Sequence, residues 1–220
     1  MTFLELCRRL RSRAGIAGTG PATVVNQSGE LGRVVDWITE SYEDIQDKRA
    51  DWDFLRLDFS FNTVNATATY AKSTVSNLAN WKKDSVRIYQ GTVNDEQFLY
   101  FKEWDEFRDF RLFGPTASAT GRPIEFSIKP DKSLVLWPIP DGIYTIRGEY
   151  YRTAHVMTAN TDEPLFDRYQ MAIVFNALMR YAEYVAEPGV YASAQKEYGR
   201  LINKLELDRT SEIGTGGPMA

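Results

Sequence analysis

The sequence predicts an α+β fold: a helical bundle made by N- and C-terminal helices, an inserted antiparallel β-rich subdomain, and a flexible C-terminal tail. Apolar side chains repeat with a period of about 3.6 residues at both ends of the 220-residue chain, and with a period of two in its middle. Terminal helices must meet to bury their apolar stripes, so the middle is interpreted as an insertion. We expect bundle helices over residues 1–52 and 154–207, the inserted subdomain with one short helix over 53–153, and the tail over 208–220.

The first helix is predicted to begin at a capping box. Thr2 is followed three residues later by Glu5, a pair that satisfies two backbone N–H groups at a helix start. The helical apolar stripe stops at Gly15, and the stretch from Gly15 to Asn26, rich in Gly, Thr and Pro, predicts a loop. The stripe consists of Phe3, Leu6, Cys7, Leu10 and Ala14.

A second, longer helix is expected after Ser28, because serine is a favoured N-cap residue. Its apolar side chains recur at helical spacing up to Ile45, and Trp52 lies just past its end. Its other face is acidic, and carboxylates at helical spacing are typical of a solvated helix face. The acidic residues are Asp36, Glu40, Glu43, Asp44 and Asp47.

The middle of the chain has the pattern of a sheet. Apolar and polar side chains alternate from Leu55 to Asn62, which predicts a half-buried strand. The polar segment from Lys72 to Lys83 predicts an exposed loop available to a tail component, and Glu103 to Leu112 predicts a short helix. Further strands are expected at 67–71, 85–90, 97–101, 123–128, 133–137 and 143–151.

The helical period returns at Pro164. It predicts a long helix that ends before Pro188 and Gly189, since proline disrupts a helix interior. A last helix follows, with its apolar side chains between Tyr191 and Leu205. Residues 208–220 contain three glycines, one proline and few apolar side chains, so we expect them to form a flexible tail.

Composition and charge argue against several classes of protein. The chain is 43% hydrophobic and 25% charged, as ordinary globular proteins are. It has 26 Lys and Arg against 30 Asp and Glu, and the formal charge of −4 argues against broad nucleic-acid binding. The one basic run is expected at the end of the first helix, where cations complement the helix dipole. This run is Arg8, Arg9, Arg11 and Arg13.

We expect no signal peptide and no membrane contact. The start, Met1 to Glu5, has no basic segment followed by an apolar run. No stretch reaches the roughly 18 apolar residues that would span a bilayer. The chain is therefore expected to fold in a cytoplasm.

Residues suited to catalysis are few. His155 is the only histidine, and no serine or cysteine motif accompanies it to form a catalytic set. The only cysteine, Cys7, excludes an intramolecular disulfide and a cysteine-based zinc site. Gly18 to Pro21 resembles a phosphate loop only superficially, because no Gly-Lys-Ser/Thr follows it. We expect no enzyme activity, no catalytic residue, no metal site and no cofactor.

The acidic face of the second helix has one non-catalytic use. If many copies placed this face around a pore, its charge would repel DNA from the wall. The alternative is simple solvation of the helix surface. The candidates for lining such a channel are Asp36, Glu40, Glu43, Asp44 and Asp47.

The aromatic content, 13%, fits either a rich core or extensive subunit interfaces. Sequence does not decide between core and interface for any one of these side chains. The aromatic residues that would suit contacts between subunits are Tyr89, Phe98, Tyr100, Phe101, Trp104, Phe107 and Phe110.

Several segments follow one another in a distinctive order. They are Thr2-Phe3-Leu4-Glu5-Leu6, the stretch from Gly29 to Ile38, Trp52-Asp53-Phe54-Leu55, the stretch from Ser133 to Gly142, and Asp162-Glu163-Pro164. No one segment is specific by itself. The ordered set spans residues 2–207 and resembles the head-to-tail adaptor proteins of tailed bacteriophages, also called connector or neck proteins.

This resemblance implies a structural virion protein. It implies a homo-oligomeric ring, dodecameric, that docks beneath the portal protein and offers its other face to a tail or nozzle protein. Double-stranded DNA would pass through the ring without specific binding, and the protein, assembled in the host cytoplasm, would lie in the virion neck. In such adaptors the C-terminal segment reaches the portal, which by position points to Arg209, Thr210, Ser211, Glu212, Ile213, Pro218 and Met219.

Other functions stay open at this point. A tail-tube or head-completion protein would have similar architecture, and sequence pattern discriminates poorly between these virion components. A virion-associated enzyme would need a pocket that joins His155 to a carboxylate. A host-side regulatory or DNA-binding module is disfavoured by the negative charge and by the lack of a helix-turn-helix with a basic recognition helix.

Overall fold

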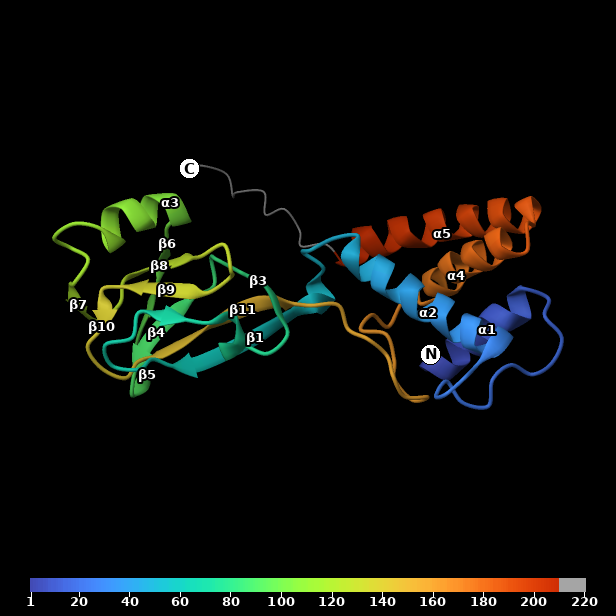
Figure 1. Cartoon of the computed structure of the whole chain (residues 1–220), viewed down its shortest axis with the longest axis horizontal. Coiled ribbons are helices and arrows are strands. Elements are labelled where there is room, and N and C mark those ends of the chain that lie inside the picture. The colour runs from blue at the N-terminus through green and yellow to red at the C-terminus, as the bar shows by residue number, and fades with distance from the viewer. Residues whose placement is uncertain (210–220) are drawn as a thin grey trace, which may run out of the picture. The chain divides into compact units, whose positions relative to one another are not determined.

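A computed structural model of the chain describes residues 1–209, which separate into two compact units. The helical unit comprises residues 1–55 and 154–209, and the β unit comprises residues 56–153. Figure 1 shows long helices in the helical unit and a set of strands with one short helix in the β unit. The predicted α+β class is therefore confirmed.

The helical unit begins with the expected capping box, since Glu5 N–H donates to Thr2 Oγ1 at 3.3 Å and Thr2 N–H donates to Glu5 Oε2 at 3.0 Å. Ser28 stands at the N-cap position of α2, but its side chain makes no capping hydrogen bond. The left-handed backbone of Gly29, with φ +61°, follows it and separates Ser28 from the regular helix. The helices of this unit are α1 (Phe3–Arg13), α2 (Gly29–Asp47), the 3₁₀ helix η1 (Asp53–Leu55), α4 (Met171–Tyr184) and α5 (Pro188–Arg209).

The core of the helical unit forms around α4, which packs against α1, α2 and α5. Three buried alanines on α4, Ala172, Ala177 and Ala182, allow the neighbouring helices to approach closely. Trp52 is fully buried, and its indole N–H donates to Ile45 O at 3.0 Å, which fixes the chain after α2 against the end of that helix. The apolar stripes predicted from the sequence are therefore buried against one another.

The boundaries of the last two helices differ from the prediction. α4 begins at Met171 rather than near Pro164, because Tyr169 has a left-handed backbone with φ +62° that a helix does not accommodate. Pro188 is the first residue of α5, a position where the missing N–H removes no helical hydrogen bond. α5 continues to Arg209, so Asp208 and Arg209, expected to begin the tail, are helical. The rest of the expected tail lies outside the described residues.

The β unit contains two main sheets. In the larger one the strand order is β1-β11-β4-β5, and β3 also pairs with β11; in the smaller one it is β2-β9-β8-β6. Two short pairs, β6 with β8 and β7 with β10, are parallel. The other strand pairs are antiparallel, as expected for the antiparallel β-rich subdomain. The strands are β1 (Arg56–Asn62), β2 (Thr69–Tyr70), β3 (Leu78–Trp81), β4 (Arg87–Gln90), β5 (Thr92–Phe98), β6 (Tyr100–Phe101), β7 (Thr120–Gly121), β8 (Glu125–Ile128), β9 (Leu134–Trp137), β10 (Ile139–Pro140) and β11 (Thr145–Arg152).

Short helical segments accompany these strands. The helix expected from Glu103 to Leu112 is present, but it consists of a single α-turn followed by a π-helical turn. The segments are η2 (Lys72–Thr74), α3 (Trp104–Phe107) and η3 (Arg108–Leu112).

Both main sheets contribute to one buried cluster in the β unit. Phe59 of β1, Ile146 of β11 and Phe126 of β8 belong to it. Gly148 lies opposite Phe59, and a Cβ there would lie 3.1 Å from the Phe59 ring and from the Val86 backbone. A side chain at position 148 would therefore disturb the contact between neighbouring strands.

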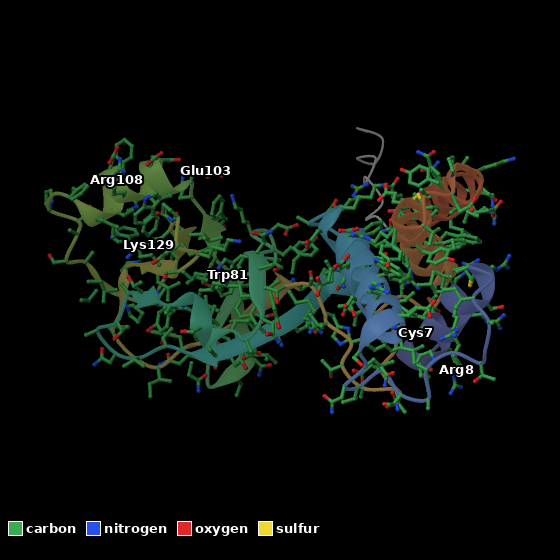
Figure 2. The ribbon with its side chains drawn as sticks, turned by 45° about the vertical axis from the view of Figure 1, so that its right-hand side comes forward. Cys7, Arg8, Trp81, Glu103, Arg108 and Lys129 are labelled. Atoms are coloured by element: carbon green, nitrogen blue, oxygen red, sulfur yellow. The ribbon has the colours of Figure 1, made fainter. Side chains whose placement is uncertain are left out.

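The segment from Lys72 to Lys83, predicted to be an exposed loop, contains strand β3, so that prediction is wrong in part. Leu78 and Trp81 are buried, and the Trp81 indole N–H donates to Lys132 O at 2.9 Å. Figure 2 shows the Trp81 side chain in the β unit. The register of β3 shifts opposite Tyr151 and Arg152, as in a β-bulge. Ala79 is the extra residue in this register. Leu78 and Trp81, three positions apart, are therefore both buried, and the alternation expected of a strand is lost from the sequence.

Candidate interaction surfaces

The acidic side of α2 lies opposite its buried side. Val34, Ile38 and Ile45 are buried, whereas Asp36 and Asp47 are exposed, as expected for an amphipathic helix. Of the five predicted acidic residues, four are exposed and Glu43 is partly buried.

Arg180 of α4 neutralises part of this acidic side. Its guanidinium donates to Glu40 Oε2 at 2.7 Å and to Asp44 Oδ2 at 2.5 Å, and Asn176 Nδ2 lies 3.3 Å from the same Asp44 oxygen. Among the described residues no ion pair is formed by Asp36, Glu43 or Asp47. The surface keeps a net negative charge, but two of its five carboxylates also join α2 to α4.

Of the residues predicted to contact the portal, only Arg209 belongs to α5 and to the described part of the chain. Arg209 is helical, and its guanidinium contacts the carboxylates of Asp167 and, at 3.6 Å, of Asp53. Arg168 also pairs with Asp208, at 3.4 Å. Arg209 is therefore tied to the helical unit. The other candidates, Thr210, Ser211, Glu212, Ile213, Pro218 and Met219, lie outside the described residues.

His155 joins a loop to α2 through its backbone and its ring. Its N–H donates to Gln46 Oε1 at 2.8 Å, and its carbonyl accepts from Gln46 Nε2 at 2.9 Å. Its Nδ1 lies 3.3 Å from Tyr42 Oη, which also accepts a hydrogen bond from Leu165 N–H at 2.9 Å. These contacts are the ones expected of a residue that fixes a loop in place.

Other groups that carry chemistry are arranged as follows. Cys7 is buried among the helices, and burial raises the pKa of its thiol to about 12, which keeps it in the unreactive thiol form. Within residues 1–209 no group of three or more His, Cys, Asp or Glu side chains is placed to hold a metal ion. Over the same residues no helix combines the length and the apolar character needed to cross a bilayer.

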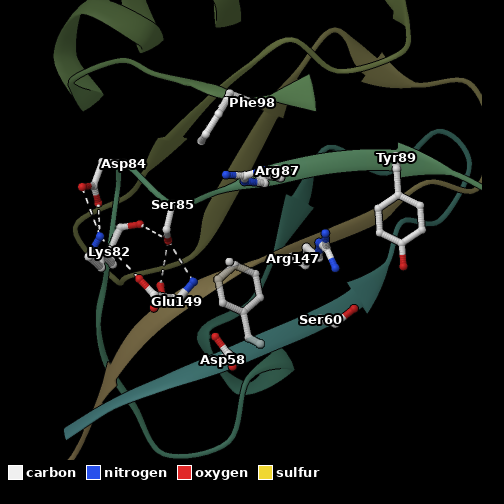
Figure 3. A pocket seen from close by; sticks show the side chains of 12 residues that line it. Asp58, Ser60, Lys82, Asp84, Ser85, Arg87, Tyr89, Phe98, Arg147 and Glu149 are labelled. Atoms are coloured by element: carbon white, nitrogen blue, oxygen red, sulfur yellow. Dashed lines mark hydrogen bonds and ion pairs between the residues drawn. The ribbon is translucent and has the colours of Figure 1, made fainter. Parts of the chain in front are cut away.

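A groove of about 780 Å³ crosses the outer face of the larger sheet in the β unit (Figure 3). Its floor comes from alternate residues of three neighbouring strands, β1, β11 and β4, because side chains of one strand face alternate sides. The charged or polar side chains that line it are Asp58, Ser60, Lys82, Asp84, Ser85, Arg87, Arg147 and Glu149.

The charges in and around this groove pair with one another. Glu96 contacts the guanidinium of Arg147 and, at 3.1 Å, that of Arg87, and these two arginines hold the pKa of its carboxyl below the usual range. Lys82 lies 3.0 Å from Asp84 and 3.4 Å from Glu149. Cations and carboxylates alternate across the face, so the positive and negative charges in the groove neutralise one another.

A family model of the SU10 adaptor protein matches residues 1–219, which is nearly the whole chain. The chain belongs to the SU10 adaptor protein family. This is a family of phage head-to-tail adaptors, which are structural proteins rather than enzymes, so the predicted family is confirmed. No match was found among the curated proteins.

In this adaptor the basic run of α1 has a role that sequence reasoning missed. Arg8 Nε donates to Pro21 O at 3.2 Å, and Arg11 Nε donates to Ala17 O at 3.1 Å. Gly20 has φ +86°, and a Cβ on it would lie 3.1 Å from the Arg8 side chain. The two arginines therefore hold the glycine-rich loop against α1. No local sequence pattern predicts these contacts between the helix and the loop that follows it.

The aromatic residues considered for subunit contacts in the adaptor differ in exposure. Phe107 is buried in the β unit, whereas Tyr100 and Phe110 are about two thirds exposed, at 69% and 68%. Phe98 is half exposed, and the guanidinium of Arg87 lies 4.1 Å from its ring centre. The remaining three, Tyr89, Phe101 and Trp104, are of intermediate exposure.

Proposed function

We propose that the chain forms a homo-oligomeric ring, dodecameric, that joins the portal at the capsid vertex to the tail or nozzle of a phage and lets double-stranded DNA pass. The observation that supports this proposal is the match to the head-to-tail adaptor family over residues 1–219. A tail-tube or head-completion role is less well supported, because the matching family is one of adaptors. The proposed location is the neck of the virion, after assembly in the host cytoplasm.

We assign the DNA channel to the acidic side of α2. Asp36, Glu43 and Asp47 have no neutralising partner among the described residues, and several copies around one axis would give a wall of like charge to the DNA phosphates. Glu40 and Asp44 would contribute less, since each is paired with Arg180. DNA would then move along this wall without being bound to it.

We assign portal attachment to the segment that follows α5. Arg209 would anchor the start of this segment to the helical unit, through Asp167 and Asp53. Beyond it only a few side chains offer apolar contacts that would offset the entropy lost when a chain segment is ordered on a partner. The residues in this role are Thr210, Ser211, Glu212, Ile213, Pro218 and Met219.

The ring is tested by negative-stain imaging and mass photometry of the purified chain with and without portal particles. We expect rings on the portal from the full chain. A chain that ends at Arg209 should keep its circular-dichroism spectrum and lose portal attachment. A full chain that stays monomeric beside portal would overturn the ring, and normal docking of the shortened chain would overturn the assignment of residues 210–220.

The channel is tested by removing its unpaired charges in the triple variant Asp36→Asn, Glu43→Gln, Asp47→Asn. We expect particles to assemble but to release DNA less completely. A matched change of three charges in the short helix of the β unit, Asp105→Asn, Glu106→Gln and Asp109→Asn, is the control. Equal DNA release from both triple variants would contradict the placement of α2 at the channel.

A further inference from the structure

The first strand of the β unit has a free edge. Among the described residues β1 pairs with β11 alone. Thr63 N–H donates to Tyr144 O at 2.7 Å, directly after the last pair of this ladder, so Thr63 occupies a hydrogen-bonded position. In an antiparallel ladder such positions alternate with positions whose backbone groups point away from the partner. The outward positions of β1 are Arg56, Asp58, Ser60 and Asn62, and no described residue bonds to their backbone groups.

The opposite edge of the same sheet is β5. Leu99 N–H donates to Val86 O at 3.0 Å, which continues the register of Phe98 with Arg87. By the same alternation the backbone groups of Glu96 and Phe98 point away from β4, and no described residue bonds to them. The free edge of β5 is shorter than that of β1, because Tyr100 N–H already donates to Ile124 O in the smaller sheet.

The two free edges run in opposite directions. Each neighbouring pair along β1, β11, β4 and β5 is antiparallel, so the first and last of these four strands are antiparallel to each other. Rotation about a ring axis that runs along the strands does not change strand direction. The β5 edge of one copy would therefore meet the β1 edge of the next copy in an antiparallel manner, which continues the pairing already present in the sheet.

We propose that β1 of one copy pairs with β5 of the next, so that the larger sheets join around the ring; this inference rests on the ring proposed above. A ring needs two different complementary surfaces on each subunit, and the two edges are such a pair. A backbone edge is recognised by another backbone edge, because only a polypeptide repeats donors and acceptors at the spacing of a strand. The occupant of β1 is thus a second copy of this chain.

Exposed apolar side chains at both edges support the pairing. Leu57 on β1 is 40% exposed, and Val93 and Phe98 on β5 are 53% and 52% exposed. Soluble proteins usually protect an outer strand with charged side chains, proline, a bulge or a cover. β1 carries two charged side chains, Arg56 and Asp58, but it has seven residues in unbroken register and no proline, and no described residue forms a hydrogen bond to its outward backbone groups. An edge of this kind is expected to be covered by a partner in the assembled protein.

The pairing is tested first by a proline at an outward position. Ser60→Pro removes a backbone N–H that the β11 ladder does not use, and outer strands tolerate proline at such positions. Ser60→Ala removes the hydroxyl and keeps the N–H, and is the matched control. We expect Ser60→Ala to form rings on portal as the unchanged chain does and Ser60→Pro to lose them, with both variants folded by circular dichroism. Normal rings from folded Ser60→Pro would overturn the pairing.

A cross-linking measurement does not depend on the folding of the proline variant. A photoreactive amino acid replaces Asp58 in a mixture of ¹⁵N-labelled and unlabelled chains, and the cross-linked peptides from rings on portal are identified by mass spectrometry. We expect mixed-isotope cross-links to residues 92–98, and none from the same amino acid at the exposed Lys72. Cross-links from position 58 to another segment, or none in intact rings, would overturn the pairing and leave the ring itself standing. If the unchanged chain forms no ring with portal, the proposed function and the pairing both fail.

Discussion

The helical unit and the β unit use their apolar side chains differently. Of the thirteen large apolar side chains that are exposed in the described chain, nine lie in the β unit, although it is the smaller unit. In the helical unit the stripes of α1, α2 and α4 are buried against one another, and charge dominates the outside of α2. The nine exposed side chains of the β unit are Leu57, Val64, Val93, Phe98, Tyr100, Phe110, Phe113, Ile124 and Ile143.

This difference indicates how the two units divide the work of an adaptor. Side chains that are already buried stabilise the subunit, whereas apolar side chains left in solvent become stabilising only when a partner covers them. Most large apolar side chains of the helical unit thus stabilise the subunit itself. The β unit has both free strand edges and exposed aromatic residues, the features on which the proposed contacts between copies depend.

The largest expected loss of stability comes from a substitution in the core of the helical unit. Trp52→Ala removes a fully buried indole and its hydrogen bond to Ile45 O, so we expect a loss of about 3–5 kcal/mol in the free energy of unfolding. Urea unfolding followed by far-ultraviolet circular dichroism measures the loss. Trp52→Phe keeps most of the volume and should lose clearly less. A loss below about 1 kcal/mol for Trp52→Ala would mean that the site is not part of the core.

A smaller effect compares one glycine from each unit. Gly148→Ala in β11 brings a Cβ to 3.1 Å from the Val86 backbone, and overpacking of this kind costs about 1–3 kcal/mol. Gly199→Ala in α5 meets no atom within 4 Å and should stabilise its helix by about 0.5–1 kcal/mol. Thermal unfolding of the two variants should therefore shift in opposite directions. Shifts of the same sign would contradict the packing described for one of the two sites.

A still smaller effect is the pH dependence of the charged sheet face. Arg147 and, next, Arg87 keep the pKa of Glu96 below its ordinary value of 4.5. A carboxyl whose pKa is lower in the folded state stabilises the fold above the unfolded value, and this contribution is lost as the pH falls through the folded pKa. Both arginines are partly exposed, so solvent weakens the effect.

The measurement is thermal unfolding as the pH is lowered from about 6 to about 3. The stability of the Glu96→Gln variant should fall less steeply than that of the unchanged chain. Glu103→Gln, which changes the same charge at an exposed site, should leave the slope as it was. A slope that is unchanged in Glu96→Gln would show that the pairing with the two arginines does not stabilise the folded state.

The parts of the fold that local sequence determines were predictable. The Thr2–Glu5 capping box and the stripe of α2 depend on residues within a few turns of each other, and both are present. The start of α4 was not predictable, since it depends on the backbone conformation of Tyr169, and β3 was missed because a bulge hides its alternation.

The same limit applies to the candidate surfaces. The acidic residues of α2 were predictable from helical spacing, but their partial neutralisation by Arg180 was not, because that contact spans 140 residues of sequence. The free edges of β1 and β5 were also hidden, since an edge exists only once the order of strands in the sheet is known. Periodicity identifies which side of an element is polar, and long-range pairing decides what that side contacts.

Two exposed side chains, one in each unit, are expected to differ in their effect on assembly although neither contributes much to stability. Tyr100→Ser in the β unit and Leu207→Ser in the helical unit both replace exposed side chains, 69% and 86% exposed, so each should change the free energy of unfolding by less than about 0.5 kcal/mol. Assembly should separate them. If the exposed apolar surface of the β unit contacts partners, Tyr100→Ser lowers the yield of rings on portal and Leu207→Ser leaves it unchanged. Equal yields from the two variants would mean that the exposed apolar side chains of the β unit do not mark the surface that contacts partners. The two units would then not differ in the way proposed.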